Sequence, residues 1–184
     1  MRKNEDIGFA IVGTGGIAEI YLDAINQVPG ADLRVVHNRS LKKAEELVSD
    51  SSVEVEISFD ALLARDDIEV VCVTTPSGAH SEVAIPAMEA GKHVLCEKPL
   101  EVTVQKVDQI IETAEKTGCI LAVVFQSRFS PEAKLLKEAI NMGRFGRLTQ
   151  CSAYIKWWRD DAYYASADWR GTWKLDGGGA LMNQ

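Results

Sequence analysis

Short apolar runs alternate with segments in which apolar residues recur at helical spacing, up to about residue 125. The apolar runs predict strands over residues 9–12, 33–36, 55–57, 68–74, 93–96 and 120–125. Helices are expected between them, over residues 17–28, 40–48, 60–64, 81–90 and 103–116. Strands that alternate with helices form a parallel sheet covered on both faces. The predicted fold class is therefore α/β, with a doubly wound parallel Rossmann sheet.

The pattern changes after residue 125. A helix is expected over 131–142, a long strand of mixed polarity over 148–158, then a loop rich in Asp, Tyr and Trp, and a helix that opens at 177–179. We therefore expect a first domain over residues 1–125 and the beginning of a second, α+β domain over 126–184. The second segment is shorter than most independent domains, so we expect it to be incomplete.

Composition excludes several classes of partner. The 184 residues are 46% hydrophobic and carry a net charge of −7 without a basic run, so no nucleic-acid partner is expected. No apolar run is long enough to cross a membrane and the start lacks a secretory signal, which predicts a cytoplasmic protein without a membrane partner. The four cysteines lack metal-ligand spacing, so we expect buried, reduced thiols and no metal.

A glycine-rich turn follows the first predicted strand and opens the first helix. It comprises Gly13, Thr14, Gly15, Gly16 and Ile17, with Ala18 as the small residue that lets the helix pack on the strand. Glycines permit a tight turn and a close approach of the backbone to a pyrophosphate, while the helix N-terminus supplies N–H donors. All five residues of this turn are therefore candidate cofactor-binding residues for a dinucleotide.

The end of the second strand bears on the choice between NAD and NADP. The position about 20 residues after the turn is Asn38, followed by Arg39 and Ser40, and no carboxylate is present to bind a ribose 2′-hydroxyl. A cation at this place can accept a 2′-phosphate, so these three candidate cofactor-binding residues favour NADP over NAD. Alternatively, Arg39 stacks on the adenine, which it could do with either cofactor.

Five motifs in order resemble the glucose-fructose oxidoreductase / inositol dehydrogenase / MocA (Gfo/Idh/MocA) family. They are FAIVGTGGIA at 9–18, TTPSGAH at 74–80, CEKPL at 96–100, FQSRFSP at 125–131 and GGGALMNQ at 177–184. The resemblance implies an NAD(P)-dependent oxidoreductase that transfers a hydride between the nicotinamide and a secondary alcohol of a sugar, nucleotide sugar or cyclitol, and a homo-oligomer. The stretch from Trp169 to Gln184 looks like the subgroup that oxidises C3 of UDP-N-acetyl-hexosaminuronates.

The resemblance also implies roles for single residues. Lys98 is the expected catalytic residue, because a partly desolvated lysine can act as a base or as a cation beside a carbinol oxygen. The other expected cofactor-binding residues are Thr74, Thr75, Pro76, His80, Glu97, Lys98, Gln126, Trp169 and Arg170, and the expected substrate residues are Lys98, Arg128 and Asn183. His80 could instead only cap a helix, and Pro99 is a candidate cis proline. Trp157 and Trp158 are expected to pack on a sheet face rather than to form a sugar platform.

Asn183 departs from the family pattern. Many members have an Asp at this site, followed four residues later by a relay His, and position 187 lies beyond this chain. We therefore expect the 184-residue chain to bind the cofactor but to be inactive as a dehydrogenase. One alternative is a non-catalytic NAD(P)-binding module or regulator. Another is a different Rossmann dehydrogenase, such as a homoserine or semialdehyde reductase, against which Glu97-Lys98-Pro99 argues.

Overall fold

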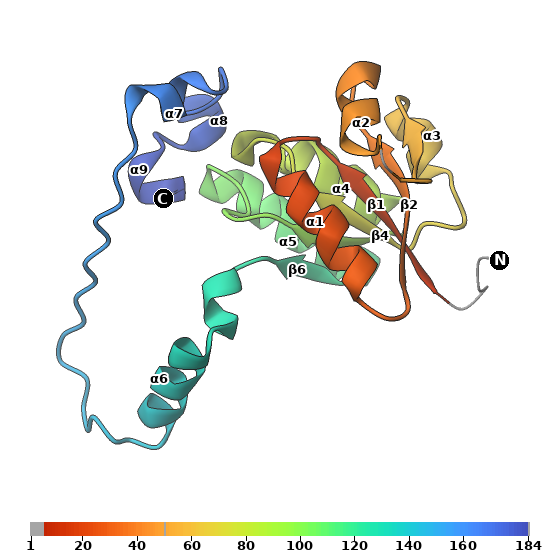
Figure 1. Cartoon of the computed structure of the whole chain (residues 1–184). Helices are drawn as coiled ribbons and strands as arrows, with labels where there is room; N and C mark the ends of the chain where they lie inside the picture. The colour runs from red at the N-terminus through yellow and green to blue at the C-terminus, as the bar shows by residue number, and fades with distance from the viewer. Residues whose placement is uncertain (1–5, 50, 184) are drawn as a thin grey trace.

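A six-stranded parallel sheet forms the centre of the computed structural model, which describes residues 6–49 and 51–183 (Figure 1). The strands are β1 (Ile7–Val12), β2 (Ala31–His37), β3 (Glu54–Glu56), β4 (Val70–Val73), β5 (His93–Cys96) and β6 (Leu121–Val123). Their spatial order is β3-β2-β1-β4-β5-β6. Strands β2 and β3 therefore lie on one side of β1, and β4, β5 and β6 lie on its other side. The predicted doubly wound parallel sheet is confirmed. Ligands of such sheets bind at the carboxyl ends of the strands, where the order reverses.

Helices cover both faces of this sheet. They are α1 (Gly16–Gln27), α2 (Leu41–Leu47), α3 (Phe59–Leu63), α4 (Ser81–Glu89) and α5 (Val104–Thr117). Ile11 packs with residues of α1 and α2, whereas its strand neighbours Ala10 and Val12 pack with residues of α3, α4 and α5. Successive side chains of a strand point to opposite faces, so a strand covered on both sides must be apolar throughout. This explains the continuous apolar runs in the sequence.

Capping residues set several of the helix ends. The hydroxyl of Thr103 accepts a hydrogen bond from the Lys106 N–H at the start of α5. Gly118 ends the same helix in the left-handed conformation, with φ 71°, which glycine adopts without a steric penalty. Ser40 precedes α2 as predicted, but its side chain makes no capping bond.

Residues 126–183, the described part of the chain after β6, form short helices and no strand. These are η2 (Gln126–Phe129), α6 (Pro131–Asn141), α7 (Asp161–Ala165), α8 (Trp173–Asp176) and α9 (Ala180–Asn183). The strand expected over 148–158 is a wrong prediction. No described segment pairs with it, and a strand exists only where a neighbour takes up its backbone hydrogen bonds. Trp157 and Trp158 are consequently 68% and 85% exposed, so the expected packing on a sheet face is also wrong.

The last part of the chain returns to the sheet after a long excursion. Figure 1 shows an extended trace from α6 to α7, after which α8 and α9 lie close to the first half of the molecule. The contact is made between α8 and the short helix η1 (Ser77–Ala79), which follows β4. Gly78 permits it, because an added Cβ would overlap the Lys174 carbonyl oxygen and lie 2.9 Å from the Leu175 Cα. Residues distant in sequence thereby reach the carboxyl ends of the strands.

The four cysteines are free thiols, but not all are buried as expected. Cys72 and Cys96 are buried, Cys119 is partly exposed and Cys151 is exposed. Burial raises the pKa of the Cys72 thiol to about 12. No cluster of three or more His, Cys, Asp or Glu side chains in residues 6–49 and 51–183 could hold a metal ion. None of the described helices is both long and apolar enough to cross a membrane.

Candidate active site

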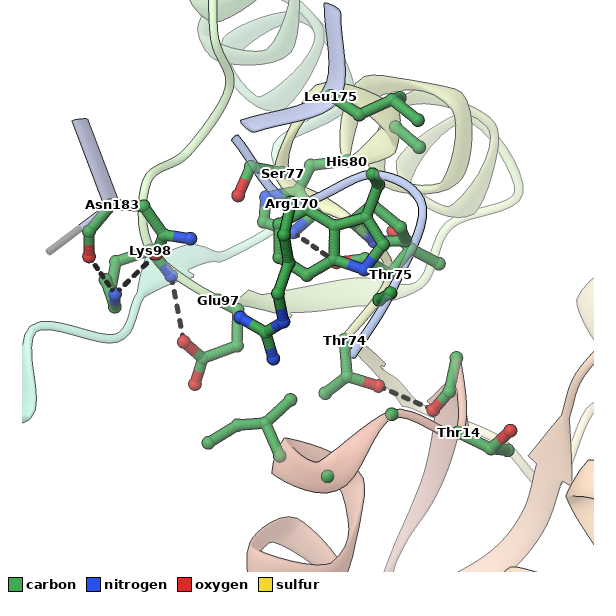
Figure 2. A pocket seen from close by; sticks show the side chains of 18 of the residues that line it. Thr14, Thr74, Thr75, Ser77, His80, Glu97, Lys98, Arg170, Leu175 and Asn183 are labelled. Atoms are coloured by element: carbon green, nitrogen blue, oxygen red, sulfur yellow. Dashed lines mark hydrogen bonds between the residues drawn. The ribbon is translucent and has the colours of Figure 1, made fainter. Parts of the chain in front are cut away.

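A large cleft of about 1780 Å³ opens at the carboxyl ends of the strands and is closed on one side by the C-terminal segments. The structure places nearly all the expected site residues along it: Gly13, Thr14, Gly15, Gly16, Ile17, Asn38, Arg39, Thr74, Thr75, Pro76, His80, Glu97, Lys98, Gln126, Arg128, Trp169, Arg170 and Asn183. Ser40 is the exception, and its backbone N–H instead donates to Asn38 Oδ1 at 2.8 Å. Figure 2 shows Glu97 and Arg170 facing the space above the glycine turn, with the Lys98 side chain to one side, against Asn183.

The glycine turn leaves open space where a ligand can lie against the backbone. Gly13 has φ 106° and sits so close to β4 that an added Cβ would lie 2.8 Å from the Thr74 carbonyl. The Thr74 hydroxyl donates to the Gly13 carbonyl at 2.8 Å and fixes the turn. By contrast, a Cβ at Gly15 or Gly16 would meet no atom within 4 Å. The turn thus has the shape and the free N–H donors that a pyrophosphate at the start of α1 requires.

Asn38 joins the ends of the first two strands. Its Nδ2 donates to Thr14 Oγ1 at 2.6 Å and its Oδ1 accepts from the Ser40 N–H, so both ends of the amide are engaged. Arg39 beside it is exposed, on the same cleft. The pair offers an amide and a cation, and no carboxylate, to a ribose lying over the end of β2.

His80 is buried in the cleft wall and tied to the backbone. It is 1% exposed, and its Nε2 and Nδ1 each lie 2.9 Å from a carbonyl oxygen, those of Thr75 and Pro99 respectively. Carbonyl oxygens only accept, so a neutral ring bonds one of them at a time, and the protonated ring bonds both. Burial is the largest influence and lowers the pKa of His80, although both carbonyls oppose it. His80 thus links the loop after β4 to the cis Lys98-Pro99 peptide, and it is more than a helix cap.

The buried carboxylate of Glu101 connects the loop after β4 with the loop that follows the cis Lys98-Pro99 peptide. Glu101 accepts hydrogen bonds from Ser81 Oγ at 2.7 Å, from the Val102 N–H at 2.6 Å and from Lys106 Nζ at 3.0 Å. Lys106 also donates to the Gly78 carbonyl at 2.9 Å. Burial alone would raise the pKa of Glu101, but these donors together lower it below the usual value. Glu101 therefore holds the loop that carries Gly78 against the start of α5.

Glu97 is held in place by a tyrosine that the sequence pattern did not single out. Tyr21 on α1 donates to Glu97 Oε1 at 3.0 Å, and the Lys98 N–H donates to Oε2 at 3.1 Å. Burial, and then the charge of Glu97, raise the pKa of Tyr21, so the phenol keeps its proton. The helical spacing of the sequence is typical of a core position for Tyr21, and nothing in the local pattern indicates the contact of its hydroxyl with Glu97.

Lys98 is the centre of a polar chain that reaches the C-terminal segment. Its Nζ donates to the Asn183 backbone carbonyl at 2.7 Å and to Asn183 Oδ1 at 2.9 Å. Asn183 Nδ2 in turn donates to Asp176 Oδ1 at 2.6 Å, and Asp176 Oδ2 accepts from the Gly171 N–H at 2.7 Å. Asp176 is 1% exposed and fixes which end of the Asn183 amide faces the lysine. Sequence reasoning missed Asp176, because an Asp before three glycines is an ordinary turn pattern.

Arg170 lies over an aromatic pair at the far wall of the cleft. Its guanidinium carbon is 4.3 Å from the centre of the Tyr163 ring and 5.0 Å from that of Trp169, and its Nη1 donates to Tyr163 Oη at 2.6 Å. In Figure 2 the guanidinium points into the space between Glu97 and the glycine turn. Its Nε is buried and without a partner among the described residues, as is the hydroxyl oxygen of Thr75. These unpaired groups fit a cleft that receives a polar ligand.

Gln126 and Arg128 reach the cleft from η2 rather than from a strand. Both are exposed, and the Arg128 guanidinium stacks on the Phe125 ring at 4.9 Å. Their position beside β6 agrees with the expected order of the motifs. Among the residues that the structure describes, neither side chain has a hydrogen bond that directs it toward Lys98.

Comparison with known proteins agrees with this geometry. A family model described as an oxidoreductase family with an NAD-binding Rossmann fold (GFO_IDH_MocA) matches residues 7–125, and one described as the GFO/IDH/MocA C-terminal domain matches residues 133–184. The inositol 2-dehydrogenase of Rhodococcus erythropolis is 35% identical over 151 residues, which are 80% of this chain and 43% of that protein. The 2,7-anhydro-N-acetylneuraminate hydratase of Mediterraneibacter gnavus is 30% identical over 154 residues, 84% of this chain and 41% of that protein.

A solved structure matches the whole chain. The WlbA dehydrogenase from Chromobacterium violaceum, in complex with NADH and UDP-GlcNAcA, has a TM-score of 0.90 and 35% identity over 100% of this chain and 53% of its own. The chain therefore spans about half the length of the proteins it matches. From the matched motifs, the strand order and the family models that cover both parts of the chain, we conclude that this protein belongs to the Gfo/Idh/MocA oxidoreductase family.

Proposed function

We propose that the chain binds NAD(P) in the cleft and is part of an oxidoreductase that acts on a secondary alcohol of a sugar, nucleotide sugar or cyclitol. The observation that carries this proposal is the position of Lys98. Its Nζ lies on the same cleft as the glycine turn, where it is held by two bonds to Asn183. A reaction at a carbinol carbon needs a polar group at the carbinol oxygen while the dinucleotide lies alongside.

The residues of the cleft fit a dinucleotide from end to end. Gly15 and Gly16 would receive the pyrophosphate, Arg170 would approach it from the opposite wall, and Thr75 and Glu97 would face the nicotinamide ribose. When bound, the nicotinamide supplies the hydride acceptor or donor. Asn38 and Arg39 favour NADP over NAD, because a cation and an amide accept a 2′-phosphate more readily than a carboxylate would.

Lys98 would hold the carbinol oxygen and exchange its proton. An ammonium group has three N–H donors, and the two bonds to Asn183 leave one for a substrate oxygen. Within the chain, the polar series ends at Asp176, whose carboxylate is engaged by Asn183 and Gly171. The substrate end of the cleft comprises Lys98, Asn183 and Arg128.

A nucleotide sugar is our preferred substrate class within this group. The WlbA relative, which is similar over the whole chain, was solved with UDP-GlcNAcA, and the cleft is larger than the roughly 300–1,000 Å³ of common ligand pockets. We also propose that residues 1–125 form the cofactor domain, that residues 126–184 begin a substrate domain, and that the protein is a homo-oligomer. Free cysteines without a disulfide among the described residues suit a cytoplasmic location.

Calorimetric titration of the chain with NADPH and with NADH tests the cofactor assignment. Both should bind, NADPH more tightly. Gly15→Val should weaken binding at least about a hundredfold, because a β-branched side chain would fill the open space above the turn. Gly15 has an ordinary φ of −77°, so the variant should fold. Equal affinity of the folded variant would contradict the proposal.

A non-catalytic nucleotide-binding module is the second candidate. Asn183 favours this candidate for two reasons. Its side-chain amide cannot relay a proton as a carboxylate can, and its backbone and side-chain oxygens together occupy two of the three N–H donors of Lys98. The two candidates differ in sugar-dependent reduction of NAD(P) by a version of the protein extended past residue 184, because the 184-residue chain alone is expected to be inactive. Inositol and UDP-GlcNAcA are the substrates to test. Enzymatic turnover should fall about 10²–10⁴-fold in Lys98→Ala, with cofactor affinity unchanged. Cofactor binding without turnover of either substrate would support the module.

A further inference from the structure

The cleft has a different charge balance from the rest of the molecule. The chain has 27 acidic and 20 basic residues. Basic side chains nevertheless predominate along the cleft: Arg39 after β2, Lys43 on α2, Lys98 after β5, Arg128 on η2, and Arg159, Arg170 and Lys174 in the C-terminal segments. The acidic residues there are Glu82, Glu97 and Asp168. A concentration of one sign of charge in a cleft attracts ligands of the opposite sign.

The dinucleotide accounts for part of this charge. Arg39 follows β2 and Lys43 lies on α2, at the part of the cleft where the adenosine half would bind, and Arg170 points toward the glycine turn (Figure 2). Lys98 is bonded to Asn183. Arg159 is not explained by any of these roles, although it lines the same cleft.

Arg159 is held by aromatic rings rather than by an acid. Its guanidinium carbon is 5.5 Å from the centre of the Trp157 ring and 4.9 Å from that of Tyr163. Its Nη1 donates to the Trp158 carbonyl at 3.2 Å, and its Nε is buried without a partner in the described part of the chain. No salt bridge between described residues includes Arg159. Aromatic stacking orients a guanidinium and leaves its charge unneutralised.

A positioned guanidinium with an unpaired N–H edge is a site for an oxyanion. The planar group presents parallel N–H donors that match a carboxylate or a phosphate, and such charge-assisted bonds are about twice as strong as neutral ones. A buried donor without a partner is costly, so a ligand that pairs with it recovers that cost. An uncharged sugar or cyclitol offers the same donors only hydroxyl oxygens, with which they form weaker hydrogen bonds than with an oxyanion.

We propose that Arg159 is an anion-binding residue of the substrate half of the cleft and selects a sugar nucleotide through a negatively charged group. The group is a carboxylate on the sugar or the diphosphate of the nucleotide, which share this chemistry. The proposal rests on the proposed function and makes it narrower, because it disfavours inositols and other neutral substrates. Tyr163 and Trp157 are the support of Arg159 and need not contact the ligand.

Binding of three related ligands separates the two sources of charge. UDP-GlcNAcA, UDP-GlcNAc and UDP are titrated into the chain with and without saturating NADH. Arg159→Gln should bind UDP-GlcNAcA about tenfold to a hundredfold more weakly than the wild type. A loss confined to UDP-GlcNAcA assigns Arg159 to the carboxylate, and an equal loss for all three assigns it to the diphosphate. The matched control is Arg147→Gln, which changes an exposed arginine outside the cleft and should bind like the wild type.

A second readout reports on Arg159 itself. Its Nε–H signal in a nitrogen-resolved NMR spectrum, identified by its loss in Arg159→Gln, should shift when UDP-GlcNAcA is added and stay in place with inositol. Equal affinity of wild type and Arg159→Gln for all three ligands would overturn the proposal, and so would a wild type that binds NADH but none of them. Failure of NADH to bind would contradict the proposed function instead, and the titrations without NADH would still test Arg159.

Discussion

Helices α5 and α6 have similar amphipathic sequences but opposite surroundings. Ile110 of α5 is fully buried in the core beneath the sheet, whereas Leu135 and Leu136 of α6 are 67% and 55% exposed. Each fully buried side chain of this size contributes about 1.5–3 kcal/mol, which α6 does not gain here. An apolar stripe stabilises a helix only when a second surface covers it.

The same contrast holds for the two halves of the cleft. The cofactor half is built on a sheet with a core on each face, while residues 126–183 contain just two buried residues among those described, Asp176 and Gly179. The C-terminal segments reach the site through the packing at Gly78 and the bonds between Lys98 and Asn183. The substrate half should therefore open or shift independently of the cofactor half.

The contact at Gly78 gives the largest expected effect. In Gly78→Val the new side chain would overlap the backbone of α8, and overpacking of this kind costs about 1–3 kcal/mol or more. Hydrogen exchange of the α8 and α9 amides should become at least about tenfold to a hundredfold faster, while β1 and β4 keep their protection. Gly16→Ala is the control, because the Cβ added there would meet no atom of the surrounding structure within 4 Å. Loss of protection throughout the sheet would show that the two regions do not separate.

Glu101 tests whether the cofactor half carries its own stability. Glu101→Gln should lower the free energy of unfolding at pH 7 by about 1–3 kcal/mol, because a buried charged hydrogen-bond network is broken. The pKa of folded Glu101 lies below its usual 4.5, so its contribution is present above pH 4.5 and lost as the pH falls through the folded value. Urea unfolding should therefore show a smaller difference between wild type and variant at about pH 3.5. A constant difference at both pH values would refute this role.

Substitution of Asn38 tests whether the preference for NAD or NADP is set by the cofactor half of the cleft alone. Asn38→Asp should shift the ratio of NAD to NADP affinity toward NAD by about tenfold, because the carboxylate repels a 2′-phosphate and accepts from a 2′-hydroxyl. Titration with both cofactors measures this affinity ratio. The hydrogen-exchange rates of the α8 amides should not change. An unaltered ratio would assign the discrimination to Arg39 or elsewhere.

Substitution of Asp176 gives the smallest expected effect. It tests the contact between Lys98 and Asn183, which connects the cofactor half of the cleft with the C-terminal segments. Asp176→Asn leaves one acceptor oxygen for two donors, Asn183 Nδ2 and the Gly171 N–H, so the orientation of the Asn183 amide toward Lys98 is less firmly held. Acylation of Lys98, followed by mass spectrometry, should become several-fold faster, since one bond of about 0.5–1.5 kcal/mol is weakened. Asp168→Asn, an exposed acid on the same cleft, is the control. Equal rates in both variants would show that Asp176 does not position the pair.

Local sequence was sufficient for the sheet and the glycine turn. The apolar runs around Ile11 and Val71 must be strands covered on both faces, and Gly13 stands where its positive φ requires glycine. Of the expected site residues, all but Ser40 line the cleft, including Lys98 and Arg170, whereas other residues of its lining, such as Lys43 and Arg159, were not expected there. The cis Lys98-Pro99 peptide, predicted from the motif, is confirmed.

Other features were decided by contacts between distant residues. The predicted strand over 148–158 is absent, because a strand depends on a neighbour that its own sequence does not supply. Tyr21 and Asp176 acquire their roles only because folding brings them to Glu97 and Asn183, 76 and 7 residues away. Arg159 is a local exception, since the two rings beside it belong to the nearby Trp157 and Tyr163, and no salt bridge within the described part of the chain includes it. Hydrophobic periodicity indicates which face of a helix or strand is apolar. The partner of a polar side chain such as Tyr21 depends instead on how elements that are far apart in the chain pack together.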